Sequence, residues 1–190
     1  SERRDSLDQN WYTFSLKLEF FPIPLPNLIT KKNFNYLTDL KLDAYIFSGG
    51  NSITELDPLT KNSAPERDNF EKLLLENALL NNTPIVGVCR GMQMINTYLG
   101  GELEKTKDHV NVYHSLISNN KNYDFPKKVN SFHEWIIPKS GLADTLEPIA
   151  YDNNGNIEAF VCKEKKILGI MWHPERDIPF NELNIELIKN

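Results

Sequence analysis

The cysteine at position 89 is the residue whose surroundings first suggest chemistry. It lies between Gly87 and Gly91 in the stretch IVGVCRGMQMINTYLGG, where an apolar run gives way to a helical pattern. A nucleophile on a sharp turn between a strand and a helix needs such glycines, because the turn is tight and the helix passes close to neighbouring strands. The N–H groups and dipole of that helix would favour the thiolate. The alternative is a buried structural cysteine, since free cysteine is among the residue types most often found inside proteins.

A general base is offered by the stretch ILGIMWHPERD at residues 167–177. Its apolar residues predict a buried strand, and His173 follows at the end of that strand, where catalytic groups gather in parallel α/β sheets. Pro174 favours an extended conformation at His173, which places Glu175 on the same side. Glu175 could then orient the imidazole while its other nitrogen takes a proton from Cys89. Taken alone, His173 could equally be a histidine bonded to a nearby carbonyl.

The stretch FSGGN at residues 47–51 could supply oxyanion donors. Acyl transfer needs preorganised donors, and a glycine N–H at a strand end can approach a substrate with no side chain in the way. Gly50, together with the backbone N–H of Arg90 just after the nucleophile, would form such a site. Taken alone, Gly49-Gly50 is a turn that ends a strand.

The elements that must position these residues follow from the apolar pattern. Helices are expected at 7–18, 33–39, 65–81, 90–101 and 180–190, and strands at 20–27 (briefly), 42–48, 84–88, 110–117, 128–132, 146–151, 156–162 and 167–172. Alternating strands and helices in the first half predict an α/β fold with a mostly parallel central sheet covered by helices on both faces. The second half is rich in hairpins. One domain over residues 1–190 is the simplest organisation.

Composition limits the classes of protein and partner. The net charge of -5 speaks against nucleic-acid binding, which requires a basic stripe. Cys89 and Cys162 are too few for a disulfide framework, which favours a reducing, cytoplasmic setting. No apolar run is long enough for a membrane span, and the opening SERRDSLDQN does not resemble a signal peptide.

With these pieces in the order GG…C…H-x-E, the sequence resembles the class I glutamine amidotransferase superfamily, and looks most like its γ-glutamyl hydrolase branch. The resemblance rests on five stretches that span nearly the whole chain: FSGGN (47–51), ERDNFE (66–71), PIVGVCRGMQMIN (84–96), VNSFHEW (129–135) and ILGIMWHPER (167–176). It implies a flavodoxin-like fold, hydrolysis of a γ-glutamyl amide through a thioester, and no cofactor. Members of this family usually begin with a short apolar strand, and this sequence starts beyond it, at SERRDSLDQ. Either residues precede Ser1 or the sheet lacks a strand, and the first alternative is favoured.

The resemblance also implies roles for individual residues. Cys89 matches the nucleophile, His173 the general base and acid, and Glu175 the residue that orients it. His133 has no carboxylate two residues on, so it is assigned to binding or to support of the site. The positions that match oxyanion and glutamyl contacts are Gly49, Gly50, Arg90, Gln93, Ser131, Phe132, His133 and Trp135.

No metal site is expected. His109 and His114 lie five residues apart in a strand-like segment, so they should face opposite sides, and no cysteine or carboxylate cluster accompanies them. The resemblance places a histidine-containing strand near the leaving-group side, where one of the two could contact substrate. Cys162, Phe160 and Trp172 are interpreted as core residues.

The leading functional hypothesis is a free-standing hydrolase that releases L-glutamate from a small-molecule γ-glutamyl substrate. Similarity to amidotransferase-like proteins of surface-polysaccharide gene clusters suggests γ-glutamyl-CDP-amidate as that substrate, on the route to capsule modification. Arg3, Arg4 or scattered lysines would then receive the anionic nucleotide. One alternative is a glutaminase subunit that delivers ammonia to a separate synthase; another is an inactive binding protein on the same scaffold. A homodimer is the oligomeric state considered.

Overall fold

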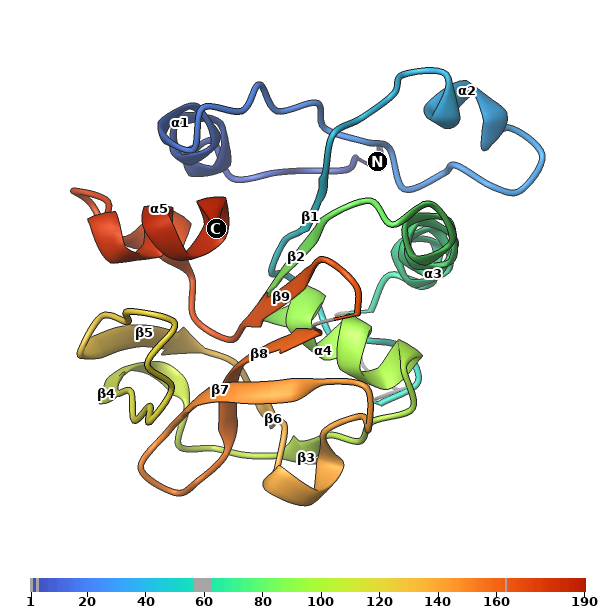
Figure 1. Cartoon of the computed structure of the whole chain (residues 1–190). Coiled ribbons are helices and arrows are strands. Elements are labelled where there is room, and N and C mark those ends of the chain that lie inside the picture. Colours follow the sequence, from blue (N-terminus) through green and yellow to red (C-terminus); the bar gives the residue numbers. More distant parts are fainter. Residues whose placement is uncertain (1, 3, 57–62, 163) are drawn as a thin grey trace.

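A five-stranded mixed sheet forms the centre of the protein, as a computed structural model shows (Figure 1). The structure describes residues 2, 4–56, 63–162 and 164–190. The strands of the sheet lie in the order β1-β2-β9-β8-β7. Their bounds are Tyr45–Phe47 for β1, Ile85–Val88 for β2, Ile167–Ile170 for β9, Ile157–Cys162 for β8 and Glu147–Tyr151 for β7.

Helices and two small sheets surround this central sheet. The helices are α1 (Asn10–Lys17), α2 (Asn35–Thr38), α3 (Pro65–Asn81), α4 (Arg90–Tyr98) and α5 (Glu182–Lys189), with 3-10 turns η1 (Lys139–Gly141) and η2 (Pro174–Arg176). The small sheets pair β4 (Val110–Ser115) with β5 (Lys128–Phe132), and β3 (Glu104–Lys105) with β6 (Trp135–Ile136).

The α/β fold predicted from the sequence is confirmed, and the sheet is mixed. β1, β2 and β9 run parallel to one another, whereas β8 is antiparallel to β9 and β7 is antiparallel to β8. The parallel half arises because α3 crosses between β1 and β2, while short turns join β7, β8 and β9 as antiparallel neighbours. The hairpins expected in the second half account for this antiparallel edge.

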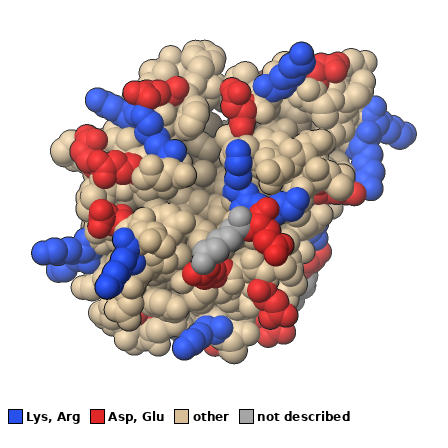
Figure 2. Space-filling view, viewed as in Figure 1, with Lys and Arg blue, Asp and Glu red and all other residues tan. Residues whose placement is uncertain are grey.

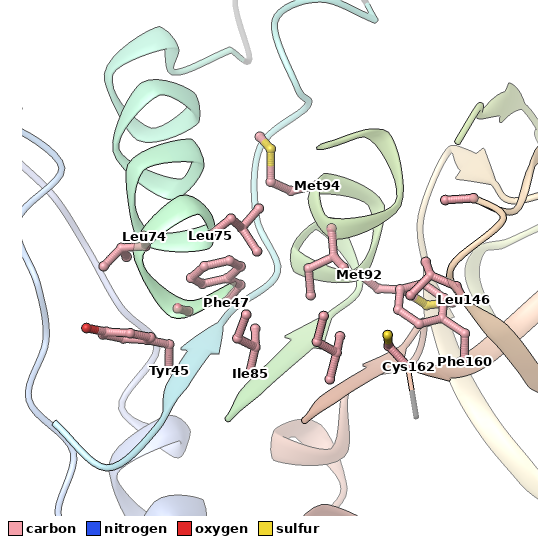
Figure 3. Packing of buried hydrophobic residues seen from close by; sticks show 14 of the residues in the cluster. Tyr45, Phe47, Leu74, Leu75, Ile85, Met92, Met94, Leu146, Phe160 and Cys162 are labelled. Carbon is pink, nitrogen blue, oxygen red and sulfur yellow. The ribbon is translucent and has the colours of Figure 1, made fainter. Parts of the chain in front are cut away.

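The sheet buries apolar side chains on both faces. On one face, side chains of β1 and β2 pack against α3 and α4, as Phe47, Leu75 and Met92 illustrate (Figure 3). On the other face lie α1 and α5, and Phe14, Trp172 and Ile185 belong to a second cluster there (Figure 1). Cys162, Phe160 and Trp172 are buried, as predicted for core residues.

Two local expectations were wrong. Residues 20–27 form no strand, because three prolines in FFPIPLPN lack the N–H that strand pairing requires. The second wrong expectation is that residues 109–114 form a regular strand, with His109 and His114 on opposite sides. The register of β4 with β5 shifts between Val110 and Val112, where Asn111 has a φ of 57°. This bulge adds one residue to the strand and therefore changes which side chains share a face.

The surface carries both signs of charge. Figure 2 shows Lys and Arg side chains interspersed with Asp and Glu side chains over one face of the molecule. Within the described residues, no helix is both long enough and apolar enough to cross a membrane.

Candidate active site

Cys89 lies on a sharp turn between β2 and α4. Its φ of 52° and ψ of -108° are strained for a residue with a side chain. A Cβ at Gly91 would overlap the carbonyl oxygen of Phe47, and one at Gly87 would come within 2.8 Å of the Met92 nitrogen. Both flanking positions therefore require glycine, because the first turn of α4 packs directly on β1 and β2. The elbow predicted from the spacing of the glycines is present.

His173 and Glu175 meet as the sequence indicates. The Nδ1 of His173 lies 2.6 Å from Oε1 of Glu175. His173 is extended, with a φ of -109° and a ψ of 91°, as a residue before proline should be. Burial lowers the pKa of His173, but its hydrogen bonds to Cys89 and Glu175 outweigh this and raise that pKa to about 9. The imidazole is thus held in its protonated form beside the cysteine.

The backbone of His173 is held by Asn130, a residue that is not among the candidates from the sequence. Asn130 Oδ1 accepts from the His173 N–H at 2.9 Å, and Asn130 Nδ2 donates to the His173 carbonyl at 2.8 Å. The ring is bounded by Phe132, edge-on at 5.8 Å between centroids, and by the backbone of Gly49, where a Cβ would overlap the imidazole. The stretch VNSFHEW does not predict this role for its asparagine, because Asn130 and His173 are 43 residues apart in the sequence.

The glycine loop after β1 is held by charged residues of α3. Arg67 donates to the carbonyls of Ser48 at 2.6 Å and of Gly49 at 3.0 Å. Gly50 has a φ of 142°, and a Cβ there would collide with the Arg67 guanidinium. The conformation of the loop that carries the expected oxyanion donor therefore depends on Arg67, to which the sequence patterns assigned no role.

The side chain of Arg90 takes part in the same buried network. It pairs with both Asp68 and Glu71 and is 1% exposed, and Glu71 also accepts from Arg67 at 2.7 Å. Both terminal nitrogens of the guanidinium are thus engaged by α3, whereas Arg90 Nε has no partner among the described residues. The oxyanion role expected of Arg90 belongs to its backbone N–H. The stretch ERDNFE supplies all three of the residues that hold the loop and Arg90.

The remaining predicted binding residues fall into two groups. Gln93 Nε2 donates to the Trp135 carbonyl at 3.0 Å, which joins α4 to the segment after β5. Ser131 Oγ donates to the His109 carbonyl at 2.7 Å, and His133 is 3% exposed. Alternation along β5 turns Phe132 toward His173 and turns Ser131 and His133 away from it. Gly49 and Phe132 therefore lie beside His173, in what we call the catalytic set (Cys89, His173 and Glu175). Ser131 and His133 lie instead with a second group of histidines.

This second group contradicts the expectation that His109 and His114 face opposite sides. Their ring centroids are 5.1 Å apart, and the ring of His133 lies 4.9 Å from that of His109. The bulge at Asn111 restores a common face to residues whose odd spacing would otherwise separate them. Burial lowers the pKa of His133 to about 3, and His109 adds to this effect, so His133 is neutral at pH 7. Glu158 of β8 completes the group.

The chain is similar to several known proteins. A family model described as glutamine amidotransferase class-I matches residues 4–182. The γ-glutamyl-CDP-amidate hydrolase of Campylobacter jejuni subsp. jejuni serotype O:2 is 33% identical over 99% of this chain and 88% of its own. A glutamine-hydrolysing GMP synthase subunit of Methanococcus aeolicus is 31% identical over 61% of this chain and 62% of its own.

Among solved structures, a Thermoplasma acidophilum protein assigned as a GMP synthase subunit has a similar fold. Its TM-score is 0.69, with 19% identity over 97% of this chain and 90% of that chain. At this level of identity the similarity describes the arrangement of helices and strands, including the mixed sheet.

Proposed function

The chain belongs to the class-I glutamine amidotransferase family, and from that premise we propose that it hydrolyses a γ-glutamyl amide through a thioester on Cys89. One observation carries this proposal. Cys89 stands on a positive-φ turn and raises the pKa of a histidine that a buried carboxylate orients at 2.6 Å. A strained, activated nucleophile next to an oriented base is the arrangement that acyl transfer requires.

In the first half of the reaction, the Cys89 sulfur attacks the γ-carbonyl carbon and forms a C–S bond. The carbonyl oxygen becomes an oxyanion, for which the N–H groups of Gly50 and Arg90 are the proposed donors. The His173 imidazolium then gives its Nε2 proton to the departing nitrogen as the C–N bond breaks. Glu175 keeps Nδ1 protonated, so Nε2 is the nitrogen that exchanges the proton.

In the second half, His173 takes a proton from water, and the resulting hydroxide attacks the thioester carbon. The C–S bond breaks, the Cys89 sulfur leaves, and L-glutamate is released. Gln93, Ser131, Phe132, His133 and Trp135 are the residues proposed to hold the glutamyl moiety. Because the side chains of Gln93 and Ser131 already bond to the protein's own carbonyls, this part of the contact would come largely from the backbone.

For the leaving group, we propose a nucleotide phosphoramidate, as in γ-glutamyl-CDP-amidate. The 33% identity to the Campylobacter jejuni hydrolase over nearly the whole chain supports this choice. A cavity of about 110 Å³ lies between the N-terminal segment and α3, where Arg4 and Arg67 are accompanied by the carboxylates of Asp5 and Glu66. Arg67 reaches the Gly49 carbonyl from that cavity, so an anion there would lie next to the glycine loop. Arg3, the other arginine considered for this role, falls outside the described residues.

Glutamate release from a panel of γ-glutamyl amides, including γ-glutamyl nucleotide phosphoramidates, tests the proposal. Cys89→Ala should abolish turnover, whereas Cys162→Ala, which removes the other buried cysteine, should retain it. Retained turnover in Cys89→Ala would sink the mechanism. If the wild-type protein neither turns over any substrate nor reacts with a glutamine-analogue chloroketone, the scaffold is an inactive binding protein.

A second candidate function is a glutaminase subunit that passes ammonia to a separate synthase. The similarity to a glutamine-hydrolysing GMP synthase subunit favours it. In that case the chain alone would hydrolyse glutamine slowly, and a synthase partner would increase the rate strongly. Substantial turnover of a γ-glutamyl phosphoramidate without any partner would decide for the free-standing hydrolase.

A further inference from the structure

Next to the catalytic set, four further side chains converge in the interior. They are His109, just before β4; His114 in β4; His133, just after β5; and Glu158 in β8. One potential ligand atom from each lies within 4.8 Å of the others. His109, His133 and Glu158 are 5%, 3% and 1% exposed, and the His114 side chain is 13% exposed. The small β4–β5 sheet and the central sheet meet at this point.

The atoms that point into the cluster lack hydrogen-bond partners. Among the described residues, these buried atoms are His109 Nδ1, His114 Nε2, His133 Nε2 and both carboxylate oxygens of Glu158. Buried polar atoms in folded proteins almost always have a partner, and an unsatisfied one costs roughly 1–3 kcal/mol, more for a charged group. Five such atoms in one place call for a ligand that all of them can share.

The second ring nitrogen of two of the histidines has a backbone acceptor: His114 Nδ1 lies 3.2 Å from the Ser115 carbonyl, and His133 Nδ1 lies 2.9 Å from the Trp135 carbonyl. His109 Nε2 lies 3.0 Å from Asp152 Oδ2 and 4.0 Å from Glu158 Oε1. Metal-binding histidines almost always donate their other ring N–H to a carboxylate or a backbone carbonyl, which fixes the tautomer and turns the free lone pair toward the ion. His114 and His133 show this pattern, and His109 is held by the carboxylate of Asp152.

We propose that His109, His114, His133 and Glu158 bind a Zn²⁺ ion. Ligand atoms at about 2.0–2.1 Å from a tetrahedral zinc lie roughly 3.3–3.4 Å from one another. Glu158 Oε2 lies 3.5 Å from His114 Nε2, and Glu158 Oε1 lies 3.8 Å from His133 Nε2. Because the four ligand atoms lie within 4.8 Å of one another, the side chains would have to draw together when the ion binds. The two positive charges of the ion would be balanced by the carboxylates of Glu158 and Asp152.

With four protein ligands the site is closed, so the ion would be structural. It would fasten the β4–β5 hairpin to strand β8 and thereby fix the segment that carries Ser131 and Phe132 beside His173. The bulge at Asn111 brings two of the proposed ligands together, because it turns His109 toward His114.

The metal content of the purified chain tests the site. After dialysis against a chelator and addition of Zn²⁺, we expect one tightly held zinc per chain by elemental mass spectrometry, with a clear rise in Tm. Co²⁺ in place of zinc should give the intense visible bands of tetrahedral coordination. His114→Ala and Glu158→Gln should each lose the bound metal and the rise in Tm.

His173→Asn is the matched control, because it removes the protein's only other histidine and should leave zinc content unchanged while turnover is lost. Zinc bound equally well by His114→Ala and Glu158→Gln would overturn the proposal. So would a chelated wild-type chain that neither takes up stoichiometric zinc nor gains thermal stability. This last measurement needs no variant, so it decides the question even if the variants fail to fold.

Discussion

The hydrogen bond between His173 and Glu175 sets the protonation of the proposed base. Glu175→Gln keeps the size of the side chain but lets its amide donate to Nδ1, which favours the wrong tautomer. We expect kcat for glutamate release to fall roughly 10²- to 10⁴-fold. Because His173 must be protonated to release the leaving nitrogen, and its pKa is about 9, wild-type kcat/KM should decline above about pH 9.

Glu175 is one of the groups that raise the pKa of His173, so this decline should begin at lower pH in Glu175→Gln. A pH–rate profile from pH 6 to 10 measures both effects. Glu164→Gln, an exposed glutamate in the turn between β8 and β9, should match the wild type. An unchanged profile in Glu175→Gln would show that Glu175 does not govern His173.

At the scale of elements, the first turn of α4 packs closely on β1. A Cβ at Gly91 would overlap the Phe47 carbonyl, so Gly91→Ala must push the helix away from the sheet. We expect it to lower the free energy of unfolding by roughly 1–3 kcal/mol and to reduce turnover, because the elbow moves with the helix. Urea denaturation measures the first effect. Leu80→Ala, at an exposed position of α3, should change little, and a neutral Gly91→Ala would contradict the packing described.

Asn130 couples two elements, β5 and the end of β9. Asn130→Ala leaves the buried N–H of His173 without a partner, at a cost of roughly 1–3 kcal/mol of stability, whereas the His173 carbonyl still accepts from the Arg176 N–H at 3.2 Å. As a positioning residue it should affect kcat much more than KM, with a loss on the order of 10²-fold. Asn130→Asp keeps the acceptor for the His173 N–H and should recover part of kcat. Equal changes in kcat for both variants would argue against positioning.

At the scale of the whole molecule, the two apolar clusters share one sheet. Trp11 and Trp172 belong to one cluster, whereas helices α3 and α4 pack on the opposite face. If the chain is one cooperative domain, tryptophan fluorescence and far-UV circular dichroism should report the same urea midpoint. A fluorescence transition at clearly lower urea than the loss of helix would divide the chain into two units.

Local patterns predicted the elements well and the distant contacts poorly. Helix α3 has the bounds that its periodicity and its first proline indicate, Pro65–Asn81. Cys89 and its glycines were recognised because the elbow is a local device. The roles of Asn130 and Arg67 were not predicted, because their partners lie far away in the sequence. The cluster around His109 was not predicted, because no residue pattern indicates a one-residue bulge. Alternation along a strand holds only while the register is regular.

The φ of Cys89 has a consequence for how stability and activity are distributed along this chain. A residue with a side chain is held there against its own preference, at a cost of order 1–3 kcal/mol, which the rest of the fold supports. Glycine adopts such angles freely. Substituting glycine at this position should therefore give a protein that melts later than its alanine counterpart, although both lack a thiol. Selection for heat resistance alone would thus act against the nucleophile itself.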